Sequence, residues 1–414
     1  MMLIGRRPVR AATAYYWFEG SWSLLHALAF TLALLYQVQV AGLTPFQLIL
    51  VGTVMEATCF LFEIPTGIVA DLYSRRLSAL IGAFVVGIGI LIQGIWPSFG
   101  PIVLATVVWG IGYTFVSGAV DAWITDEVGE NAMQPLFTRY QQQHLALTVV
   151  GTILAGVVGQ VNLQLPMIVA GAGFLVLGVV MTVVMPENGF HPVPRPERDT
   201  WSHLRRTLLT GVAAARRPGV VRSFLVIAVL TGVSSEVFDR LWTARVLEAF
   251  RLPTVLGVDD PAIWFTAFAL IGSLLALLAS VLANRLATER LNALHPAGLL
   301  ATLLLVQVAG MVGFALSGSL WPALVALWVR DSARAIAYPV QGAWINRNVE
   351  SRTRATTLSL TSQADAIGQV VGGPPLGALA TRTSIPVALL VSAGVLAPAA
   401  LVYARLRPSP DETD

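Results

Sequence analysis

The chain has 414 residues, of which 56% are hydrophobic and only 12% are charged, and its mean hydropathy is +0.72. An average soluble domain carries about one-quarter charged residues, so this composition excludes an ordinary soluble protein. The formal net charge of +3 is too small to indicate nucleic-acid binding, and we expect no nucleic-acid partner. All basic residues are arginine, which hints at a GC-rich bacterial genome.

Apolar runs of about 20 residues, long enough to cross a bilayer as a helix, recur along the whole chain. Arg6, Arg7 and Arg10 precede a first apolar segment that is too long for the core of a cleavable signal, so we expect the first span to be retained. The sequence predicts an all-α polytopic membrane protein with twelve transmembrane helices in two pseudo-repeated six-helix bundles. The predicted spans are 14–40, 46–70, 77–97, 101–124, 137–161, 164–185, 221–247, 261–284, 293–317, 321–347, 354–380 and 384–405.

With twelve crossings, twenty of the twenty-six arginines fall on one side of the membrane. Loops rich in arginine stay in the cytoplasm, which predicts that both termini are cytoplasmic in a multi-pass protein of the cell inner membrane. A polar stretch separates the halves, so we expect an N-terminal bundle (1–185), a cytoplasmic linker (186–219) and a C-terminal bundle (220–414). Within the linker, residues 201–215 are compatible with a short amphipathic helix on the inner leaflet or with a solvated tether.

The two halves resemble each other at an offset of 221 residues, which superposes Ala122-Trp123-Ile124 on Ala343-Trp344-Ile345. The same offset superposes Gly151 on Gly372 and Gly156 on Gly377. Two six-span halves related by a repeat are typical of secondary transporters, whose substrate site lies near the bilayer midplane between the repeats.

The connection between the second and third spans reads Gly-Ile-Val-Ala-Asp-Leu-Tyr-Ser-Arg-Arg, from Gly67 to Arg76. It resembles the loop signature of the major facilitator superfamily, with matches at Gly67, Asp71, Arg75 and Arg76. Leu72 and Ser74 depart from the signature, because they replace its first basic residue and its second glycine. The resemblance covers essentially the whole chain and implies the twelve-helix fold and transport by alternating access.

The resemblance also implies a conformational latch at this connection, made of Gly67, Asp71, Arg75 and Arg76 with Asp121 or Asp126. Gly67 would allow close helix approach, as small residues do in membranes. Asp71 would face the positive amino terminus of the eleventh span. Arg75 would pair with Asp121 or with Asp126 at the end of the fourth span.

Ionisable residues inside the spans are expensive in lipid and are therefore candidates for proton coupling or substrate binding. Glu236 and Arg240 are four residues apart and are expected to pair, which leaves Asp239 as the acid more free to take a proton. The alternative is that several of these residues form internal ion pairs that fix packing, and a helical histidine is more often a packing residue. The candidates for proton coupling or the substrate cavity are Glu236, Asp239, Arg240, Asp365, Glu56, His26, Glu19, Asp331, Arg334, Tyr36, Trp242 and Tyr338.

Aromatic residues in the spans, combined with acids, are typical of a cavity for lipophilic and cationic compounds. The sequence thus favours a secondary transporter that exports hydrophobic or amphipathic compounds in exchange for protons. The alternatives are a proton symporter that imports a small polar nutrient and an exporter of a lipid or siderophore. The span that would carry the glycine and proline signature of drug exporters, the fifth, has glycines but no proline.

No catalytic histidine and cysteine set, metal-ligand spacing or phosphate-binding loop is present in the sequence, so we expect no enzymatic activity. We expect no cofactor and no metal, with the proton gradient as the energy source. The expected partners are a lipophilic small-molecule substrate, protons and the lipid bilayer, and the expected state is a monomer.

Overall fold

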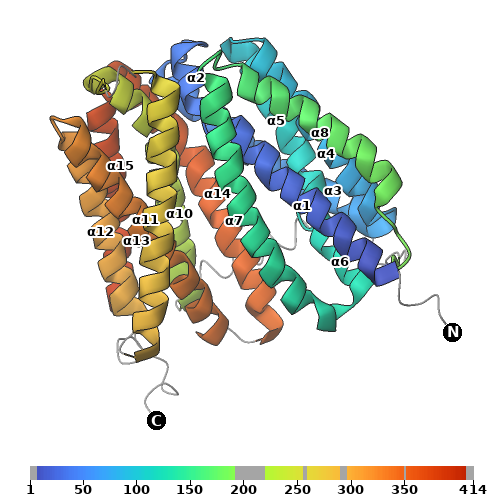
Figure 1. The fold of residues 1–414 in the computed structure, drawn as a ribbon. Helices are drawn as coiled ribbons and strands as arrows, with labels where there is room; N and C mark the ends of the chain where they lie inside the picture. The colour runs from blue at the N-terminus through green and yellow to red at the C-terminus, as the bar shows by residue number, and fades with distance from the viewer. Residues whose placement is uncertain (1–6, 192–219, 255–258, 290–295, 349–350, 407–414) are drawn as a thin grey trace. The chain divides into compact units, whose positions relative to one another are not determined.

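The computed structural model describes residues 7–191, 220–254, 259–289, 296–348 and 351–406. Every regular element among them is a helix, which confirms the predicted all-α fold (Figure 1). The elements are α1 (Arg7–Phe30), α2 (Ala33–Gln39), α3 (Pro45–Leu72), α4 (Arg75–Ile95), α5 (Phe99–Val116), α6 (Ala119–Val128), η1 (Glu130–Ala132), α7 (Met133–Gly159), α8 (Leu165–Val184), α10 (Val220–Ala249), α11 (Pro261–Glu289), α12 (Pro296–Leu316), α13 (Leu320–Asn348), α14 (Ser351–Arg382) and α15 (Ile385–Arg405).

Ten helical segments among the described residues are long and apolar enough to cross a membrane. The two remaining long helices are α13 and α14, which correspond to the tenth and eleventh predicted spans and carry Arg330, Asp331, Arg334 and Asp365. Two predicted spans are each divided into two helices. The fourth breaks at Gly118, whose φ of +74° is a left-handed conformation that glycine adopts without strain, and the first breaks between α1 and α2.

The chain divides into two compact units, which are described separately. Unit 1 comprises Met1–Leu43, Ala57–Leu204 and Val258–Thr266, and unit 2 comprises Thr44–Glu56, Arg205–Gly257 and Ala267–Asp414. In unit 1, α1 packs against α6, α7 and α8, and α4 packs against α5, α6 and α8 (Figure 1). In unit 2, α10 packs against α14 and α15, and α12 packs against α13 and α15. The part of the predicted linker that covers 192–219, with its possible amphipathic helix, lies outside the described residues.

The internal repeat read from the sequence has a structural counterpart in the glycines of α7 and α14. A Cβ added at Gly151 on α7 would lie 2.4 Å from the carbonyl oxygen of Leu24 on α1. A Cβ added at the matching Gly372 on α14 would lie 2.5 Å from the side chain of Val233 on α10. Since close approach in a membrane requires small residues, each glycine lets its helix pack tightly on the first long helix of its unit.

The second glycine of each half, Gly156 or Gly377, also lies against a neighbouring helix. Within unit 1, a Cβ at Gly156 would lie 2.6 Å from Oγ1 of Thr266 in α11. Within unit 2, a Cβ at Gly377 would lie 3.3 Å from Ile49 in the first turns of α3. The glycines of the eleventh predicted span are thus packing positions, as are those of the fifth.

Candidate functional site

Four charged side chains join α10 to α13 in unit 2, and we call them the arginine network: Asp239, Arg330, Asp331 and Arg334. Arg330 Nη1 lies 2.7 Å from Asp239 Oδ1 and 2.8 Å from Asp331 Oδ1. Arg334 Nη1 lies 2.8 Å from Asp239 Oδ2. The guanidinium of Arg330 is buried and also lies 4.4 Å from the ring centroid of Phe238.

This arrangement corrects one expectation from the sequence. Asp239 is not a free acid, because each of its two oxygens accepts a hydrogen bond from a different arginine. The spacing within α10 revealed only the pair of Glu236 with Arg240. Both partners of Asp239 come from α13, more than 90 residues later in the chain. The alternative, internal ion pairs, therefore holds for all four residues of the arginine network.

Glu236 is the most buried carboxylate of α10, with a relative exposure of 3%. Its Oε1 lies 3.3 Å from Nε of Arg240, which confirms the pair expected from the spacing of four residues. Gly52, in the segment of α3 that belongs to unit 2, lies directly against this pair: a Cβ there would be 1.8 Å from Glu236 Oε1. Glu56, one turn further along α3, lies within electrostatic range of Arg240 and of Asp365.

A cavity of about 310 Å³ opens beside the arginine network between α10, α11 and α13. We call it the aromatic cavity, because Trp242, Phe268 and Trp328 line it together with Asp239, Arg330 and Asp331. Nε1 of Trp328 donates a hydrogen bond to the carbonyl of Phe268 at 3.3 Å, which holds the indole across the gap between α13 and α11. Two of the predicted acids and one predicted tryptophan thus share one cavity.

A second cavity of about 340 Å³ lies between α10, α12, α13, α14 and α15, and we call it the mixed cavity. It brings together the predicted residues Arg334, Tyr338 and Asp365. Asp365 Oδ2 accepts a hydrogen bond of 2.7 Å from Gln369 Nε2. Gln307 and Gln341 add amide groups to the wall, neither of which was a candidate from the sequence.

Unit 1 surrounds its embedded acids with neutral hydrogen-bonding groups. The hydroxyl of Tyr15 lies 3.3 Å from Asp121 Oδ1, and the hydroxyl of Tyr140 is hydrogen-bonded to Glu19. Ser23 Oγ lies 2.8 Å from Nδ1 of His144. These contacts join α1 to α6 and α7, and they use Tyr15, Tyr140 and His144, which were not candidates from the sequence.

His26 and Tyr36, both predicted for the cavity, have different surroundings. The ring of His26 lies 4.6 Å from that of Phe30, which in turn lies 4.9 Å from Trp109. Tyr36 is completely buried, and its hydroxyl donates a hydrogen bond of 2.6 Å to the carbonyl of Gln93 on α4. The structure therefore places Tyr36 in the packing between α2 and α4.

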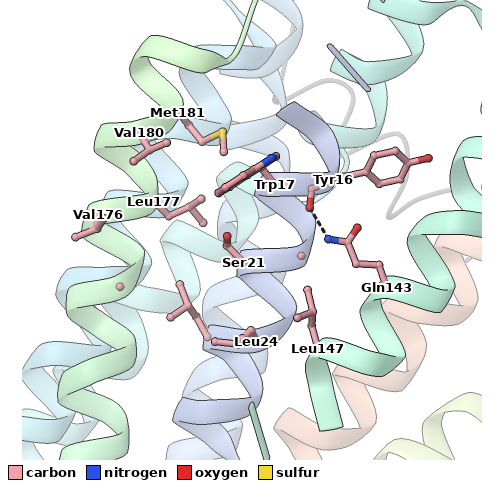
Figure 2. A pocket seen from close by; sticks show the side chains of 13 residues that line it. Tyr16, Trp17, Ser21, Leu24, Gln143, Leu147, Val176, Leu177, Val180 and Met181 are labelled. Carbon is pink, nitrogen blue, oxygen red and sulfur yellow. Dashed lines mark hydrogen bonds between the residues drawn. The ribbon is translucent and has the colours of Figure 1, made fainter. Parts of the chain in front are cut away.

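An apolar groove of about 540 Å³ lies in unit 1 between α1, α7 and α8 (Figure 2). Trp17 of α1 lies beside Leu177 and Met181 of α8, as Figure 2 shows. On the other side, Gln143 of α7 donates a hydrogen bond of 3.0 Å to the carbonyl of Tyr16. Gln143 is thus engaged by the backbone of α1.

The predicted latch is built around Arg75 at the start of α4. Its Nη1 lies 2.5 Å from Asp126 Oδ2 and 2.8 Å from the carbonyl of Ala122. Of the two acids left open by the sequence, Asp126 is therefore the partner, while Asp121 accepts from Tyr15. Asp71 lies 3.8 Å from Arg75, and its predicted position opposite the eleventh span stays a prediction.

The predicted close helix approach at Gly67 stays a prediction. A Cβ added at Gly67 would meet no atom of the described residues within 4 Å. The motif implied a tight packing contact, but the neighbouring helices contact α3 elsewhere, for example where Thr66 Oγ1 donates a hydrogen bond of 3.0 Å to the carbonyl of Thr114 on α5.

Ser74, which replaces a glycine of the family signature, has a defined role. Its Oγ accepts from the backbone N–H of Leu77 at 2.8 Å and so caps the amino terminus of α4. The same hydroxyl donates to Glu187 at 2.6 Å, and Glu187 also accepts from the backbone N–H of Arg76 at 2.9 Å. The first residues after α8, which were predicted to begin the linker, are thus attached to unit 1.

The fold and the buried polar groups define a class: a polytopic helical membrane transporter with charged side chains inside its spans. The model of the Major Facilitator Superfamily matches residues 20–329, so the chain belongs to this superfamily. A Bacillus subtilis (strain 168) protein described as the uncharacterized MFS-type transporter YxaM is 21% identical over 362 residues, which is 86% of each chain.

Solved structures with a similar fold include several transporters. A POT family transporter in complex with 5-aminolevulinic acid has a TM-score of 0.72 at 14% identity, with 98% of this chain and 97% of that chain covered. The nucleoside transporter NupG (D323A mutant) has a TM-score of 0.71 at 12% identity, with 96% and 98% covered. A bacterial homolog of the human lysosomal transporter Spinster has 0.68 at 16%, with 97% and 99% covered. At these identities the likeness supports the fold.

Proposed function

We propose that this transporter exports hydrophobic or amphipathic compounds, including lipophilic cations, in exchange for protons. We further propose that it does so as a multi-pass protein of the cell inner membrane, as a monomer and with both termini in the cytoplasm. Alternating access is the mechanism that this class of fold implies. The energy source that we propose is the proton gradient.

The observation that carries the proposal is the position of Glu236. It is buried, it has an ion-pair partner on its own helix, and it precedes Asp239 of the aromatic cavity by three residues. Residues three apart are neighbours on one side of a helix, so protonation of Glu236 would change the electrostatic potential at Asp239 in the cavity wall. A neutral carboxyl is cheaper to bury than a charged one, so a buried acid that is reached by water can exchange its proton at modest cost.

The lining of the aromatic cavity supports the choice of substrate. Trp242, Phe268 and Trp328 offer flat apolar surfaces, and Asp239 and Asp331 offer carboxylate oxygens. A cation over an aromatic ring gains roughly 0.5–2 kcal/mol, depending on how well it is desolvated. A flat lipophilic cation fits this combination of groups better than a sugar does.

Transport by purified protein in liposomes with an imposed pH gradient tests the proposal. We expect gradient-driven movement of ethidium in wild type and its loss in Glu236→Gln. The matched control is Glu248→Gln, an exposed acid near the end of the same helix, which is expected to transport at the wild-type rate. Full gradient-driven transport by Glu236→Gln would refute the assignment of the proton to Glu236.

The same assay distinguishes the proposed exporter from a proton symporter that imports a polar nutrient. A panel of sugars, nucleosides and amino acids on the outside should show no uptake driven by protons if the proposal holds. Accumulation of a polar solute, without movement of ethidium, would show that the transporter is a symporter.

A further inference from the structure

We propose that the mixed cavity of unit 2 is a binding site for small amphipathic zwitterions, distinct from the aromatic cavity proposed for lipophilic cations. The cavity has a volume of about 340 Å³, within the range of about 300–1,000 Å³ that is usual for small-molecule sites. Its lining comes from five helices of one unit, so this site does not depend on how the two units are arranged.

The two opposite charges of the cavity carry the argument. Arg334 on α13 and Asp365 on α14 both line it, and each feels the charge of the other. Arg334 is paired with Asp239 and Asp365 is hydrogen-bonded to Gln369, while both side chains line the mixed cavity. A guanidinium has five N–H donors and a carboxylate has about four acceptor positions, so both groups can bind a ligand while keeping these contacts.

The remaining lining completes a site for an amphipathic compound. Thr231, Gln307 and Gln341 offer hydroxyl and amide groups, and Leu300, Leu304 and Leu396 offer an apolar wall. A ligand with an ammonium group near Asp365, a carboxylate near Arg334 and an apolar body would satisfy all three kinds of surface. A lipophilic cation would bring a second positive charge close to the guanidinium of Arg334, and like charges repel each other.

Arg334 also connects the two cavities. The carboxylate of a bound zwitterion would share this guanidinium with Asp239, and Asp239 lines the aromatic cavity. Occupancy of one cavity would therefore change the affinity of the other, and by linkage the effect would be reciprocal.

Binding of three related probes to the purified full-length protein in detergent tests the site, without any gradient. The probes are L-phenylalanine, phenylpropionate and phenethylamine, which share one apolar body and differ in charge. By titration calorimetry we expect wild type to bind phenylalanine at least about tenfold more tightly than either analogue, which corresponds to about 1.4 kcal/mol. Equal binding of all three, or no binding of phenylalanine at millimolar concentration, would overturn the proposal.

Two variants assign the charges. Asp365→Asn is expected to abolish the preference for phenylalanine over phenylpropionate, and Arg334→Gln the preference for phenylalanine over phenethylamine. Because Arg334→Gln also removes an ion pair to Asp239, Arg334→Lys serves as a folded variant in which the preference over phenethylamine is kept in part. Preferences that are unchanged in Asp365→Asn would overturn the assignment whatever the fate of the arginine variants.

The matched control is Gln363→Ala, which lies between cavity residues on α14 but is not part of the lining. It is expected to bind the probes as wild type does. These experiments measure binding only, so their failure would leave the proposed proton-coupled export untouched, and loss of transport in Glu236→Gln would not affect them.

Discussion

In unit 1 Glu19 of α1 and Asp121 of α6 are hydrogen-bonded to tyrosine hydroxyls, whereas in unit 2 Asp239 of α10 and Asp331 of α13 are paired with arginines. A hydroxyl remains a usable partner whether the acid is charged or neutral, since it can donate to a carboxylate or accept from a carboxylic acid. An arginine loses its counter-charge when the acid is protonated. Protonation of Asp239 or Asp331 in unit 2 should therefore disturb its surroundings more than protonation of Glu19 or Asp121 in unit 1.

The largest loss of stability is expected for a change at Arg330. Arg330→Gln removes the buried guanidinium shared by Asp239 and Asp331 and should lower the stability of unit 2 by about 3–5 kcal/mol. The measurement is thermal unfolding in detergent, with Arg382→Gln at the exposed end of α14 as the control. If the melting temperature of Arg330→Gln equals that of the control, the arginine network does not stabilise unit 2.

Alanine substitutions at the repeated glycines test whether an added methyl group destabilises the two units equally. Gly151→Ala would force a methyl group against the backbone of Leu24, and Gly372→Ala would force one against the side chain of Val233. Overpacking costs about 1–3 kcal/mol, and a backbone can yield less than a side chain can. We expect the larger loss of thermal stability for Gly151→Ala, and the opposite order would contradict the packing described for the repeat.

A smaller loss of stability is expected when a hydroxyl contact of unit 1 is removed. Tyr15→Phe removes the donor to Asp121 and should cost about 1 kcal/mol, because the acid stays accessible to solvent. Tyr73→Phe, on an exposed tyrosine, is the control and should have no effect on unfolding. A loss for Tyr15→Phe as large as that for Arg330→Gln would show that the two units depend on their polar contacts equally.

The smallest effect is expected at Ser74. Ser74→Gly restores the glycine of the family signature but removes the cap of α4 and the contact with Glu187. Glycine is tolerated at such caps, so the loss should be only about 0.5 kcal/mol, and Ser74→Ala should lose about 1 kcal/mol. Equal stability of wild type and both variants would show that the hydroxyl has no structural role.

The sequence predicted the fold because lipid imposes a strong rule: each crossing needs a long apolar helix. It also predicted the pair of Glu236 with Arg240, because both residues lie on one helix at a fixed spacing. It left Arg75 with two possible acids, and the structure chose Asp126. Such contacts between neighbouring spans were within reach of the family resemblance.

Contacts between segments far apart in the sequence could not be predicted from residue spacing. Asp239 was expected to be free because the two arginines that hold it lie on α13, and nothing in the spacing indicates how α10 and α13 face each other. Gly52 gave no signal either, although it lies directly against Glu236. The hydroxyl partners Tyr15 and Tyr140 were missed because a tyrosine in an apolar span has the same pattern whether it packs or donates.

The central claim is that Glu236 carries the proton that is exchanged for substrate, and proton release on binding tests it most directly. Ethidium is added to the detergent-solubilised protein in weakly buffered solution, and the change in pH is followed with a dye. At a pH low enough to protonate Glu236, wild type and Glu248→Gln should each release protons as ethidium binds, whereas Glu236→Gln should bind ethidium and release none. Equal proton release by Glu236→Gln and wild type would contradict the claim.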